Sequence, residues 1–317
     1  MTTLLVSTVG GHLTQLHGLV PRFDGLDTCD RLWVTHRTEQ SESLLAHENV
    51  IWVPYIEERD VTGVLRAIGP ALRLIEERNV DSVVSTGSAI AVAYLAAGRL
   101  RGRRAVFIES TAFVRSRSRT GQIVRRIPGV ETFTQSRAMS NGHWQYRGSV
   151  LDNYESERAQ TRDPKRLVVT VGTSRSFGYR RLLERLVSIV PHDVDVLWQT
   201  GSTDTDGLDI DSTPWMPHAQ LAAAAEGADV VIAHAGGGSA LTSLDAGRRP
   251  LLVPRKAASG DFNDDHQLEI AELLAERRLA LVRDVEDLSW SDVVEAARWR
   301  VHRAGAAGPF DLHPGRR

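Results

Sequence analysis

The segment Asp229-Val-Val-Ile-Ala-His-Ala-Gly-Gly-Gly-Ser239 decides the fold class of this chain. Its first five residues form a short apolar run, typical of a buried strand, and a helical stretch follows its three glycines. Because a helix start leaves its first backbone N–H groups without intrahelical partners, a glycine-rich turn there favours a phosphate group. We therefore predict that this turn binds a phosphate group, through Gly236, Gly237, Gly238 and Ser239.

A second strand and a polar loop follow within the same unit. Leu251-Leu-Val-Pro254 is another apolar run, and the loop after it ends in Asp264-Asp-His-Gln267. The side chains of His266 and Gln267 can hydrogen-bond hydroxyl groups near the sheet edge that carries the glycine turn. A phosphate site beside a polyhydroxyl site indicates a sugar nucleotide as the ligand.

Length and composition indicate a soluble globular protein. At 317 residues the chain exceeds one ordinary α/β core, and 42% hydrophobic with 25% charged residues is usual for soluble proteins. The net charge of −2 does not favour nucleic acid as a partner. The single cysteine, Cys29, agrees with a reducing cytoplasm, and no apolar run approaches the roughly 20 residues of a membrane span. We expect a cytoplasmic protein, soluble or peripheral on the inner face of the cell membrane.

Strand-like and helix-like segments alternate along both halves of the chain, which predicts two parallel sheets. We predict an N-terminal domain over 1–152, an exposed linker and hinge over 152–165, a C-terminal domain over 166–303 and a flexible tail over 304–317. A final amphipathic helix is expected over Ser291–His302. The predicted fold class is α/β, with two doubly wound, Rossmann-like domains that face a central cleft. The expected strands include Leu4–Ser7, Arg31–Thr35, Val50–Pro54, Asp81–Ser85, Ala105–Glu109, Leu167–Val171 and Val194–Gln199.

Glycine and polar residues follow several of these strands. Gly10-Gly-His12 follows the first strand, Thr86-Gly87 the fourth, and Gly172-Thr173 opens the second domain. Doubly wound sheets bind their ligands at the carboxyl ends of the strands. The segment Val9–Gln15 lacks the Gly-x-Gly-x-x-Gly spacing, so a nicotinamide dehydrogenase is disfavoured. We predict that Gly10, Gly11, Thr86 and Gly87 form ligand-binding loops.

Two side chains in the first domain are candidates for catalysis. His12 lies at an expected helix start, where the positive helix end favours a neutral, basic imidazole; a helix-cap histidine bonded to backbone is an equal alternative. Glu109 ends a buried strand, where a carboxylate is costly without a partner. It could orient His12, hold a substrate hydroxyl or pair with a neighbouring arginine.

Residues 113–127 combine five arginines with Phe113, Val114, Ile123, Val124 and Ile127. A basic and partly apolar segment can dock on an anionic membrane surface. Arginine side chains also recognise a pyrophosphate well. A plain solvated face is as consistent with the sequence as these two readings together.

The motifs quoted above resemble one family of glycosyltransferases. His234-Ala-Gly-Gly-Gly-Ser239, Asp265-His-Gln267 and Val169-Thr-Val-Gly-Thr173 are similar to the catalytic subunit of the two-part enzyme that extends dolichol-pyrophosphate-GlcNAc. Gly10-Gly-His-Leu-Thr-Gln15 and Thr86-Gly87 look like its membrane-recruiting partner subunit. Bacterial exopolysaccharide pairs are similar, and MurG-like enzymes unite both halves in one chain. This chain looks like such a fusion.

The resemblance implies a GT-B fold and an inverting, metal-independent transfer of GlcNAc or a related hexose from a UDP-sugar. The implied acceptor is a lipid-linked pyrophosphate in polysaccharide biosynthesis, and no cofactor is implied beyond the UDP-sugar itself. His12 would be the base, with Gly10, Gly11, Thr86 and Gly87 on the acceptor side. The implied donor residues for sugar, ribose and uracil are Thr173, Trp215 to His218, His234, Asp265, His266 and Gln267.

The chain departs from the family at one donor position. Relatives carry an acidic residue early in the helix after the glycine turn, where it binds ribose; Thr242 stands there, and Asp245, one turn further, is the candidate replacement. Two rival functions remain open. One is a UDP-GlcNAc 2-epimerase of similar architecture, and the other is a non-catalytic partner that binds a UDP-sugar or anchors another transferase.

Overall fold

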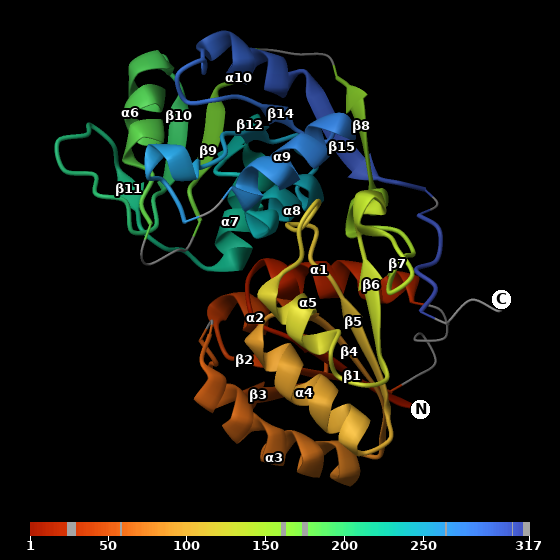
Figure 1. Ribbon diagram of the computed structural model, residues 1–317. Coiled ribbons are helices and arrows are strands. Elements are labelled where there is room, and N and C mark those ends of the chain that lie inside the picture. Colours follow the sequence, from red (N-terminus) through yellow and green to blue (C-terminus); the bar gives the residue numbers. More distant parts are fainter. Residues whose placement is uncertain are drawn as a thin grey trace. The chain divides into compact units, whose positions relative to one another are not determined.

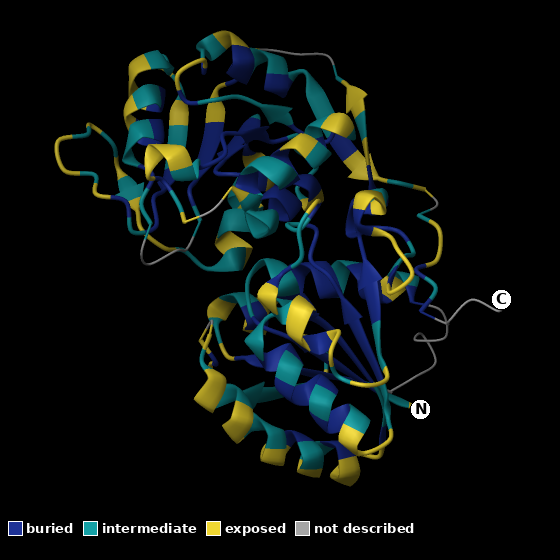
Figure 2. Ribbon diagram, viewed as in Figure 1, coloured by how far each residue is buried: buried dark blue, intermediate teal, exposed yellow. Residues whose placement is uncertain are grey.

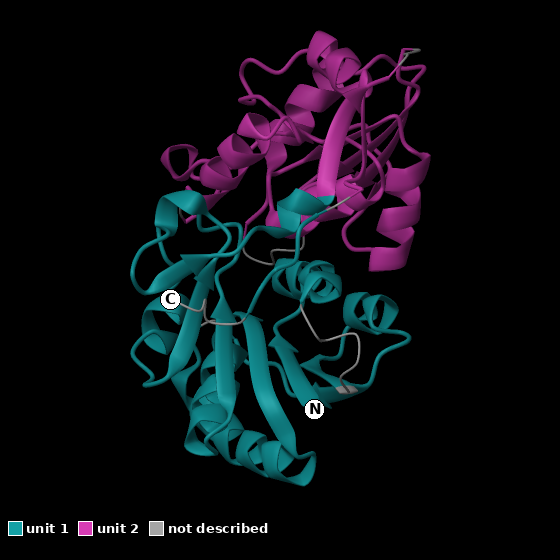
Figure 3. Ribbon diagram, turned by 90° about the vertical axis from the view of Figure 1, so that its right-hand side faces the viewer, with its two compact units in different colours: residues 1–153, 306–317 teal, residues 154–305 magenta. Residues whose placement is uncertain are grey.

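The computed structural model describes residues 1–23, 30–57, 59–159, 163–172, 177–263, 265–305 and 307–312. The chain forms two compact units, which are drawn in different colours in Figure 3. Unit 1 contains residues 1–153 and 306–317, and unit 2 contains residues 154–305. Figure 1 labels the helices and strands of each unit.

Unit 1 is built on a seven-stranded sheet in the order β3-β2-β1-β4-β5-β6-β7, and all its paired strands are parallel. The strands are β1 (Thr2–Ser7), β2 (Asp30–His36), β3 (Val50–Val53), β4 (Val80–Gly87), β5 (Arg104–Ile108), β6 (Val130–Thr134) and β7 (Trp144–Tyr146). The helices are α1 (Gly11–Leu19), α2 (Glu39–Leu44), α3 (Val61–Glu77), α4 (Ala89–Leu100) and α5 (Arg119–Val124). Short 3-10 turns cover Val20–Arg22, Arg137–Met139 and Val150–Asn153.

The central strands of unit 1 are apolar along their length because the sheet is covered by helices. Leu4, Val6, Val83 and Phe107 are fully buried or nearly so in one hydrophobic cluster with the inner residues of α3 and α4. Figure 2 shows the central strands β1, β4 and β5 largely buried, with exposed residues on the outward sides of helices such as α3. The alternation of strands and helices predicted for this half is confirmed.

Unit 2 has a six-stranded parallel sheet in the order β11-β10-β9-β12-β13-β14. Its strands are β9 (Arg166–Thr170), β10 (Asp195–Gln199), β11 (Ser212–Thr213), β12 (Val230–Ala233), β13 (Leu251–Leu252) and β14 (Leu281–Val282). Its helices are α6 (Arg180–Ile189), α7 (His218–Gly227), α8 (Gly237–Asp245), α9 (His266–Glu276) and α10 (Trp290–Ala297), and a 3-10 turn covers Ala257–Ser259. Leu167, Val169, Ile232 and Leu251 form its buried centre with α6 and α10.

The predicted linker and the predicted final helix are both wrong over part of their length. β8 (Tyr154–Arg158) lies inside the predicted linker, and β15 (Trp299–Arg303) begins inside the predicted helix Ser291–His302. The two strands pair antiparallel from Trp299 with Arg158 to Arg303 with Tyr154. Tertiary pairing overrides the local signal, because each segment alone is too polar to indicate a strand.

The expectation of a loose tail is wrong for residues 307–312. Phe310 is completely buried, and its ring lies 5.8 Å from the ring of Phe23 and 6.3 Å from that of Phe133. Its backbone N–H donates to the carbonyl oxygen of Arg22 at 2.7 Å. One aromatic side chain therefore fixes this segment in unit 1.

Each sheet has one point where the direction of winding reverses. In unit 1 the reversal lies between β1 and β4, and in unit 2 it lies between β9 and β12. Open α/β sheets bind their ligands at the carboxyl ends of the two strands that flank such a point. The residues that follow these four strands are therefore where a ligand is expected.

Candidate active site

His12 reaches across the reversal point of the first sheet. It lies in the first turn of α1, and its Nδ1 is 2.7 Å from the carbonyl oxygen of Thr86, the next-to-last residue of β4. A carbonyl oxygen can only accept, so Nδ1 carries the proton and donates it, and Nε2 carries the lone pair of the neutral ring. The Thr86 hydroxyl donates in return to the His12 carbonyl oxygen at 2.8 Å. This tautomer is the one that a general base needs.

Gly87 provides the space for the His12 ring. It has φ +115°, and a Cβ atom there would lie 2.9 Å from Cε1 and Nδ1 of His12. Gly10, with φ +80°, is the N-cap of α1, and its N–H donates to Oε1 of Gln40 at 2.8 Å. Gly11 is the first residue of the helix. The structure thus brings Gly10, Gly11, His12, Thr86 and Gly87 together at one sheet edge.

Glu109 is fully buried directly after β5. Its Oε2 accepts from the backbone N–H of Ser118 at 3.1 Å and from the Ser118 hydroxyl at 3.0 Å, and its Oε1 accepts from the N–H of Ser110 at 3.2 Å. Burial raises the pKa of Glu109 to about 7, against these hydrogen bonds and the charge of Arg117, which lower it. Its described bonds hold the loop that links Ser110 to Ser118.

A buried amide network, which was not predicted from the sequence, joins this loop to α1. Oε1 of Gln15 accepts from the N–H of Thr111 at 2.9 Å, and its Nε2 donates to the Ser110 hydroxyl at 3.0 Å. Nε2 of Gln135, which follows β6, donates to Oε1 of Gln15 at 3.1 Å and to the Glu109 carbonyl oxygen at 3.0 Å. Gln15 and Gln135 are 1% exposed. Nothing in the sequence marks either glutamine as buried.

The apolar residues of the segment 113–127 differ in their exposure, and Phe113 and Ile127 are half-buried. Val114 and Val124 are buried, and Ile123 is 49% exposed. Within the described ranges, no helix has both the length and the apolar character that crossing a bilayer requires.

In unit 2, the glycine turn follows β12 as predicted. Gly236 is the N-cap of α8, and the first bond of the helix runs from the N–H of Ala240 to the carbonyl oxygen of Gly236 at 3.0 Å. The N–H groups of Gly237, Gly238 and Ser239 precede that bond, so they lie at the positive helix end. Among the described residues, no side chain caps this end. The turn therefore has the geometry of an anion site.

His234 packs between two glycines at the reversal point of the second sheet. A Cβ atom on Gly172 would lie 2.6 Å from Cε1 of His234, and one on Gly236 would lie 2.3 Å from Nε2. Nδ1 of His234 lies 3.4 Å from the carbonyl oxygen of Thr170, at the end of β9. Burial, together with the nearby charge of Arg255, lowers the pKa of His234 to about 3, so the ring is neutral. Its role in the described contacts is to shape the turn.

Gln267 lies in the first turn of α9 rather than in a loop. Its Oε1 accepts from the N–H of Arg255 at 3.0 Å, and Oδ1 of Asp265, the N-cap of α9, accepts from the N–H of Ala257 at 2.9 Å. His266 is the first residue of this helix. These bonds tie the start of α9 to the segment that follows β13.

Arg255 is a buried cation that the sequence did not single out. It is 1% exposed, and its Nη2 donates to the carbonyl oxygens of Val171 at 2.9 Å and Phe177 at 3.1 Å. Its guanidinium lies 5.2 Å from the ring centre of Tyr179, and burial lowers its pKa. Arg255 thus connects the segments after β9 and β13 near His234. Thr173 lies outside the described residues.

The side chains of Thr242 and Asp245 both form hydrogen bonds within unit 2. The Thr242 hydroxyl is buried and donates to the carbonyl oxygen of Gly238 at 3.0 Å. Oδ1 of Asp245 accepts from the Tyr154 hydroxyl at 2.7 Å and from Nη2 of Arg303 at 2.6 Å. Asp245 therefore links α8 to β8 and β15, which counts against its prediction as a ribose-binding replacement.

The predicted uracil residues lie between β11 and α7. Trp215 is 52% exposed, and His218 is the first residue of α7. Burial lowers the pKa of His218, while the charge of Asp245 raises it. The lowered pKa favours a neutral imidazole near the carboxyl edge of the second sheet.

This architecture is that of the GT-B glycosyltransferases, as the comparison with solved structures shows. The crystal structure of Acinetobacter baumannii MurG superposes with a TM-score of 0.57 at 19% identity, covering 93% of this chain and 89% of that one. A putative UDP-N-acetylglucosamine 2-epimerase from Listeria monocytogenes superposes with a TM-score of 0.59 at 10% identity, covering 98% of this chain and 92% of that one.

Sequence comparison finds a glycosyltransferase family match within unit 2. Residues 166–297 match the family model of the glycosyltransferase family 28 C-terminal domain. A UDP-N-acetylglucosamine–N-acetylmuramyl-(pentapeptide) pyrophosphoryl-undecaprenol N-acetylglucosamine transferase from Chlorobium phaeobacteroides is 25% identical over 251 residues, which are 70% of this chain. The chain spans 64% of the length of that relative.

Proposed function

We propose that this protein is a glycosyltransferase that moves GlcNAc or a related hexose from a UDP-sugar to a lipid-linked pyrophosphate acceptor. The observation that carries the proposal is the match of residues 166–297 to the glycosyltransferase family 28 C-terminal domain. This stretch contains both the glycine turn at the start of α8 and Gln267 at the start of α9. The similarity to the Chlorobium phaeobacteroides transferase supports GlcNAc as the sugar and a lipid pyrophosphate as the acceptor.

In this proposal unit 2 binds the donor. The N–H groups of Gly237, Gly238 and Ser239 hold the diphosphate, whose negative charge grows as the bond to the sugar breaks. Fixed backbone donors stabilise that charge without reorganising, because the helix already orients them. His266 and Gln267 are assigned to the sugar, and His218 with Trp215 to the uracil. Arg255 is a positioning residue, since its bonds hold the segments around the turn.

Unit 1 provides the base in the same proposal. Nε2 of His12 takes the proton from the acceptor hydroxyl while that oxygen attacks the anomeric carbon of the donor sugar. The bond between this carbon and the diphosphate oxygen breaks, and its electron pair leaves with UDP. A single displacement of this kind inverts the anomeric configuration, and in this proposal the N–H groups at the start of α8, rather than a metal ion, stabilise the leaving diphosphate. The chain would then unite in one polypeptide the donor and acceptor halves that some relatives divide between two subunits.

The decisive experiment follows transfer from a panel of UDP-sugars to an isoprenyl-pyrophosphoryl sugar acceptor, with and without EDTA. We expect UDP-GlcNAc or a related UDP-hexose to raise the melting temperature, and transfer to require the acceptor and to persist in EDTA. Nuclear magnetic resonance of the product would show the inverted anomer. Binding without transfer to any lipid-linked acceptor would instead favour a non-catalytic partner of another transferase.

A second candidate function is a UDP-GlcNAc 2-epimerase, and the structural similarity to the Listeria monocytogenes protein is the observation behind it. An epimerase converts UDP-GlcNAc in the absence of any acceptor. Incubation with UDP-GlcNAc alone therefore separates the two functions. Appearance of UDP-N-acetylmannosamine without any acceptor would favour the epimerase.

A further inference from the structure

Unit 1 contains a basic cavity that the proposed chemistry does not use. Its volume is about 430 Å³, within the size range of small-molecule sites, and four arginines line it. Gln122 and Asn141 contribute amide groups, and none of the nine described lining residues is a carboxylate. A cavity with this many cationic and neutral donors favours an anion with several oxygen atoms.

The cavity is formed by segments that follow two neighbouring strands. Arg117 lies in the loop after β5, and Met139 and Asn141 lie after β6; these strands pair in parallel. The cavity thus lies at the carboxyl edge of the first sheet, the edge that also carries His12. Doubly wound sheets bind their ligands at this edge, so the position favours a ligand site over an incidental surface hollow.

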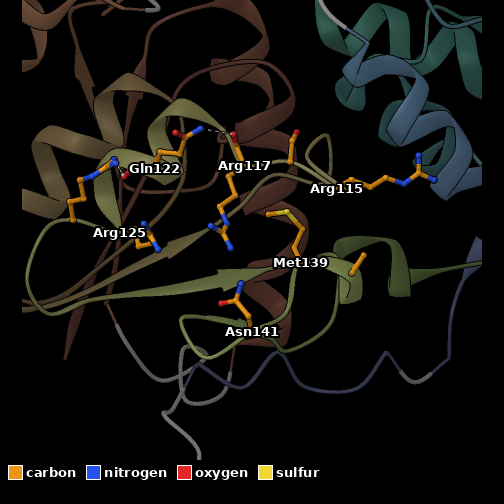
Figure 4. A pocket seen from close by; sticks show the side chains of 9 residues that line it. Arg115, Arg117, Gln122, Arg125, Met139 and Asn141 are labelled. Atoms are coloured by element: carbon orange, nitrogen blue, oxygen red, sulfur yellow. Dashed lines mark hydrogen bonds between the residues drawn. The ribbon is translucent and has the colours of Figure 1, made fainter.

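The arginines of the cavity are partly oriented by other contacts. Figure 4 shows Arg117 extending toward the space between Arg125 and Asn141, whereas Arg115 extends away from them. The Arg117 guanidinium lies 5.7 Å from the ring centre of Trp144, which is fully buried. Nη1 of Arg126 donates to the carbonyl oxygen of Gln122 at 2.7 Å. A guanidinium that is already held loses less entropy when it binds an anion.

Hydrogen bonds to buried side chains hold the loop that carries Arg117. Glu109 accepts two hydrogen bonds from Ser118, the residue after Arg117, and Gln15 holds Thr111 at the other end of the loop. Gln15 lies in α1, one turn after His12. One buried network therefore connects the cavity wall to the helix that carries the proposed base.

We propose that this cavity binds the diphosphate group of the lipid-linked acceptor, with Arg117 and Arg125 on its oxygen atoms. The inference rests on the proposed function and names the part of the acceptor that unit 1 recognises. A diphosphate offers more oxygen acceptors than a single phosphate, which suits several guanidinium groups and two amides around one space. Ile123, 49% exposed on α5 beside Gln122, supplies an apolar surface for the first part of the lipid chain.

Calorimetry on the full chain tests this inference with farnesyl diphosphate and farnesyl monophosphate as soluble probes. We expect the diphosphate to bind more tightly than the monophosphate. Because charge-assisted hydrogen bonds are lost, Arg125→Gln and Arg117→Gln/Arg125→Gln are expected to weaken diphosphate binding by about tenfold or more. Arg119→Gln is the matched control, since Arg119 lies on the same helix and does not line the cavity. It is expected to bind like the parent protein.

Three results would overturn the inference. The first is equal diphosphate affinity in Arg125→Gln, Arg119→Gln and the parent. The second is no diphosphate binding by the parent. The third is an Arg125→Gln variant that keeps its affinity for the diphosphate but no longer sediments with phosphatidylglycerol vesicles. That result would make the cavity a site for membrane headgroups. UDP binding, measured on the same samples, separates these failures from failure of the proposed function: retained UDP affinity leaves the donor half intact.

Discussion

His12 and His234 occupy mirrored places in two separate sheets. Each imidazole directs Nδ1 across a reversal point to a carbonyl oxygen of the strand on the other side, Thr86 for His12 and Thr170 for His234. Each also packs on a glycine with positive φ, at 87 and 172. The environments differ, however, because His234 is 8% exposed with a strongly lowered pKa, whereas His12 is only half-buried. The same local arrangement thus holds the half-buried imidazole proposed as the base in unit 1 and a buried, neutral imidazole in unit 2.

Replacing His12 tests the assignment of the base. We expect His12→Ala to lower kcat by about 10²–10⁴-fold, because the acceptor hydroxyl loses its proton acceptor. The affinity for UDP is expected to stay within about twofold of the parent value, since the donor residues lie in unit 2. His143→Ala, at an exposed position of unit 1, is the control. Full turnover in His12→Ala would remove this residue from the role.

Replacing Gly236 tests the packing of His234. The backbone of Gly236, at φ −71° and ψ 137°, suits any residue, but an added Cβ would lie 2.3 Å from Nε2 of His234. Gly236→Ala is therefore expected to destabilise the protein by about 1–3 kcal/mol and to weaken UDP binding. Gly227→Ala, where a Cβ meets nothing within 4 Å, is the matched control.

The double variant Gly236→Ala/His234→Ala separates the clash from any other effect of alanine. We expect it to recover part of the stability lost in Gly236→Ala, because the ring that meets the new methyl group is gone. Denaturant unfolding of the four proteins gives the coupling between the two sites. Strictly additive losses would contradict the packing described for this turn.

Asp245 is predicted to act in folding rather than in ribose recognition. Asp245→Asn removes a charge that accepts from both Tyr154 and Arg303, so we expect a stability loss of about 1–3 kcal/mol. The ratio of the affinities for UDP and 2′-deoxy-UDP, measured by calorimetry, is expected to be the same as in the parent. A ratio that collapses toward one in Asp245→Asn would instead establish Asp245 as the ribose ligand. Tyr154→Phe, which keeps the charge, is expected to cost less stability.

Glu109 gives stability a defined dependence on pH. Its pKa, raised mainly by burial to about 7, is higher in the folded protein than in the unfolded chain. Its contribution is therefore complete below about pH 4.5 and is lost as the pH rises through about 7, by up to about 3 kcal/mol. Glu109→Gln, whose amide oxygen can still accept from Ser118, is expected to lack this loss.

His234 changes the free energy of unfolding with pH in the opposite direction to Glu109, and comparing Glu109→Gln with the parent cancels the effect of His234. The pKa of His234 is lowered, so its contribution is present above about pH 6.5 and is lost as the pH falls toward about 3. Because both proteins carry His234, the difference in their unfolding free energies between pH 4.5 and 8 reports Glu109 alone. A constant difference over this range would disprove a raised pKa for Glu109.

The parallel sheets could be predicted from the sequence because their strands are buried on both faces and are therefore apolar along their length. The strand, turn and helix from Val230 to Asp245 could also be predicted. An apolar run followed by three glycines indicates a strand that ends at a helix start, where the backbone N–H groups are open to an anion. Pairing between distant segments could not be predicted. β8 and β15 are polar strands, and only their mutual hydrogen bonds make them regular.

The candidate site was predictable at its turns but not in its supporting contacts. Gly10, His12 and Gly236 lie within a few residues after a strand, and Thr86 lies at the end of one, so their places at the sheet edges follow from the topology. The burial of Arg255 and Gln135 could not be predicted, because a buried arginine or glutamine looks like any surface residue in sequence. Their roles depend on carbonyl oxygens from other segments, which three-dimensional packing alone brings within reach.

The burial of Phe310 in unit 1 has a practical consequence for dissecting the protein. An acceptor-side fragment that stops at Asn153 would omit the aromatic plug seated against Phe23 and Phe133, leaving a hole lined by two phenyl rings. Such a fragment is expected to self-associate through this exposed apolar surface, even though it retains His12, the proposed base. Co-expression with a peptide covering residues 307–312, or fusion of that segment to the fragment through a short linker, would restore the packing of Phe310.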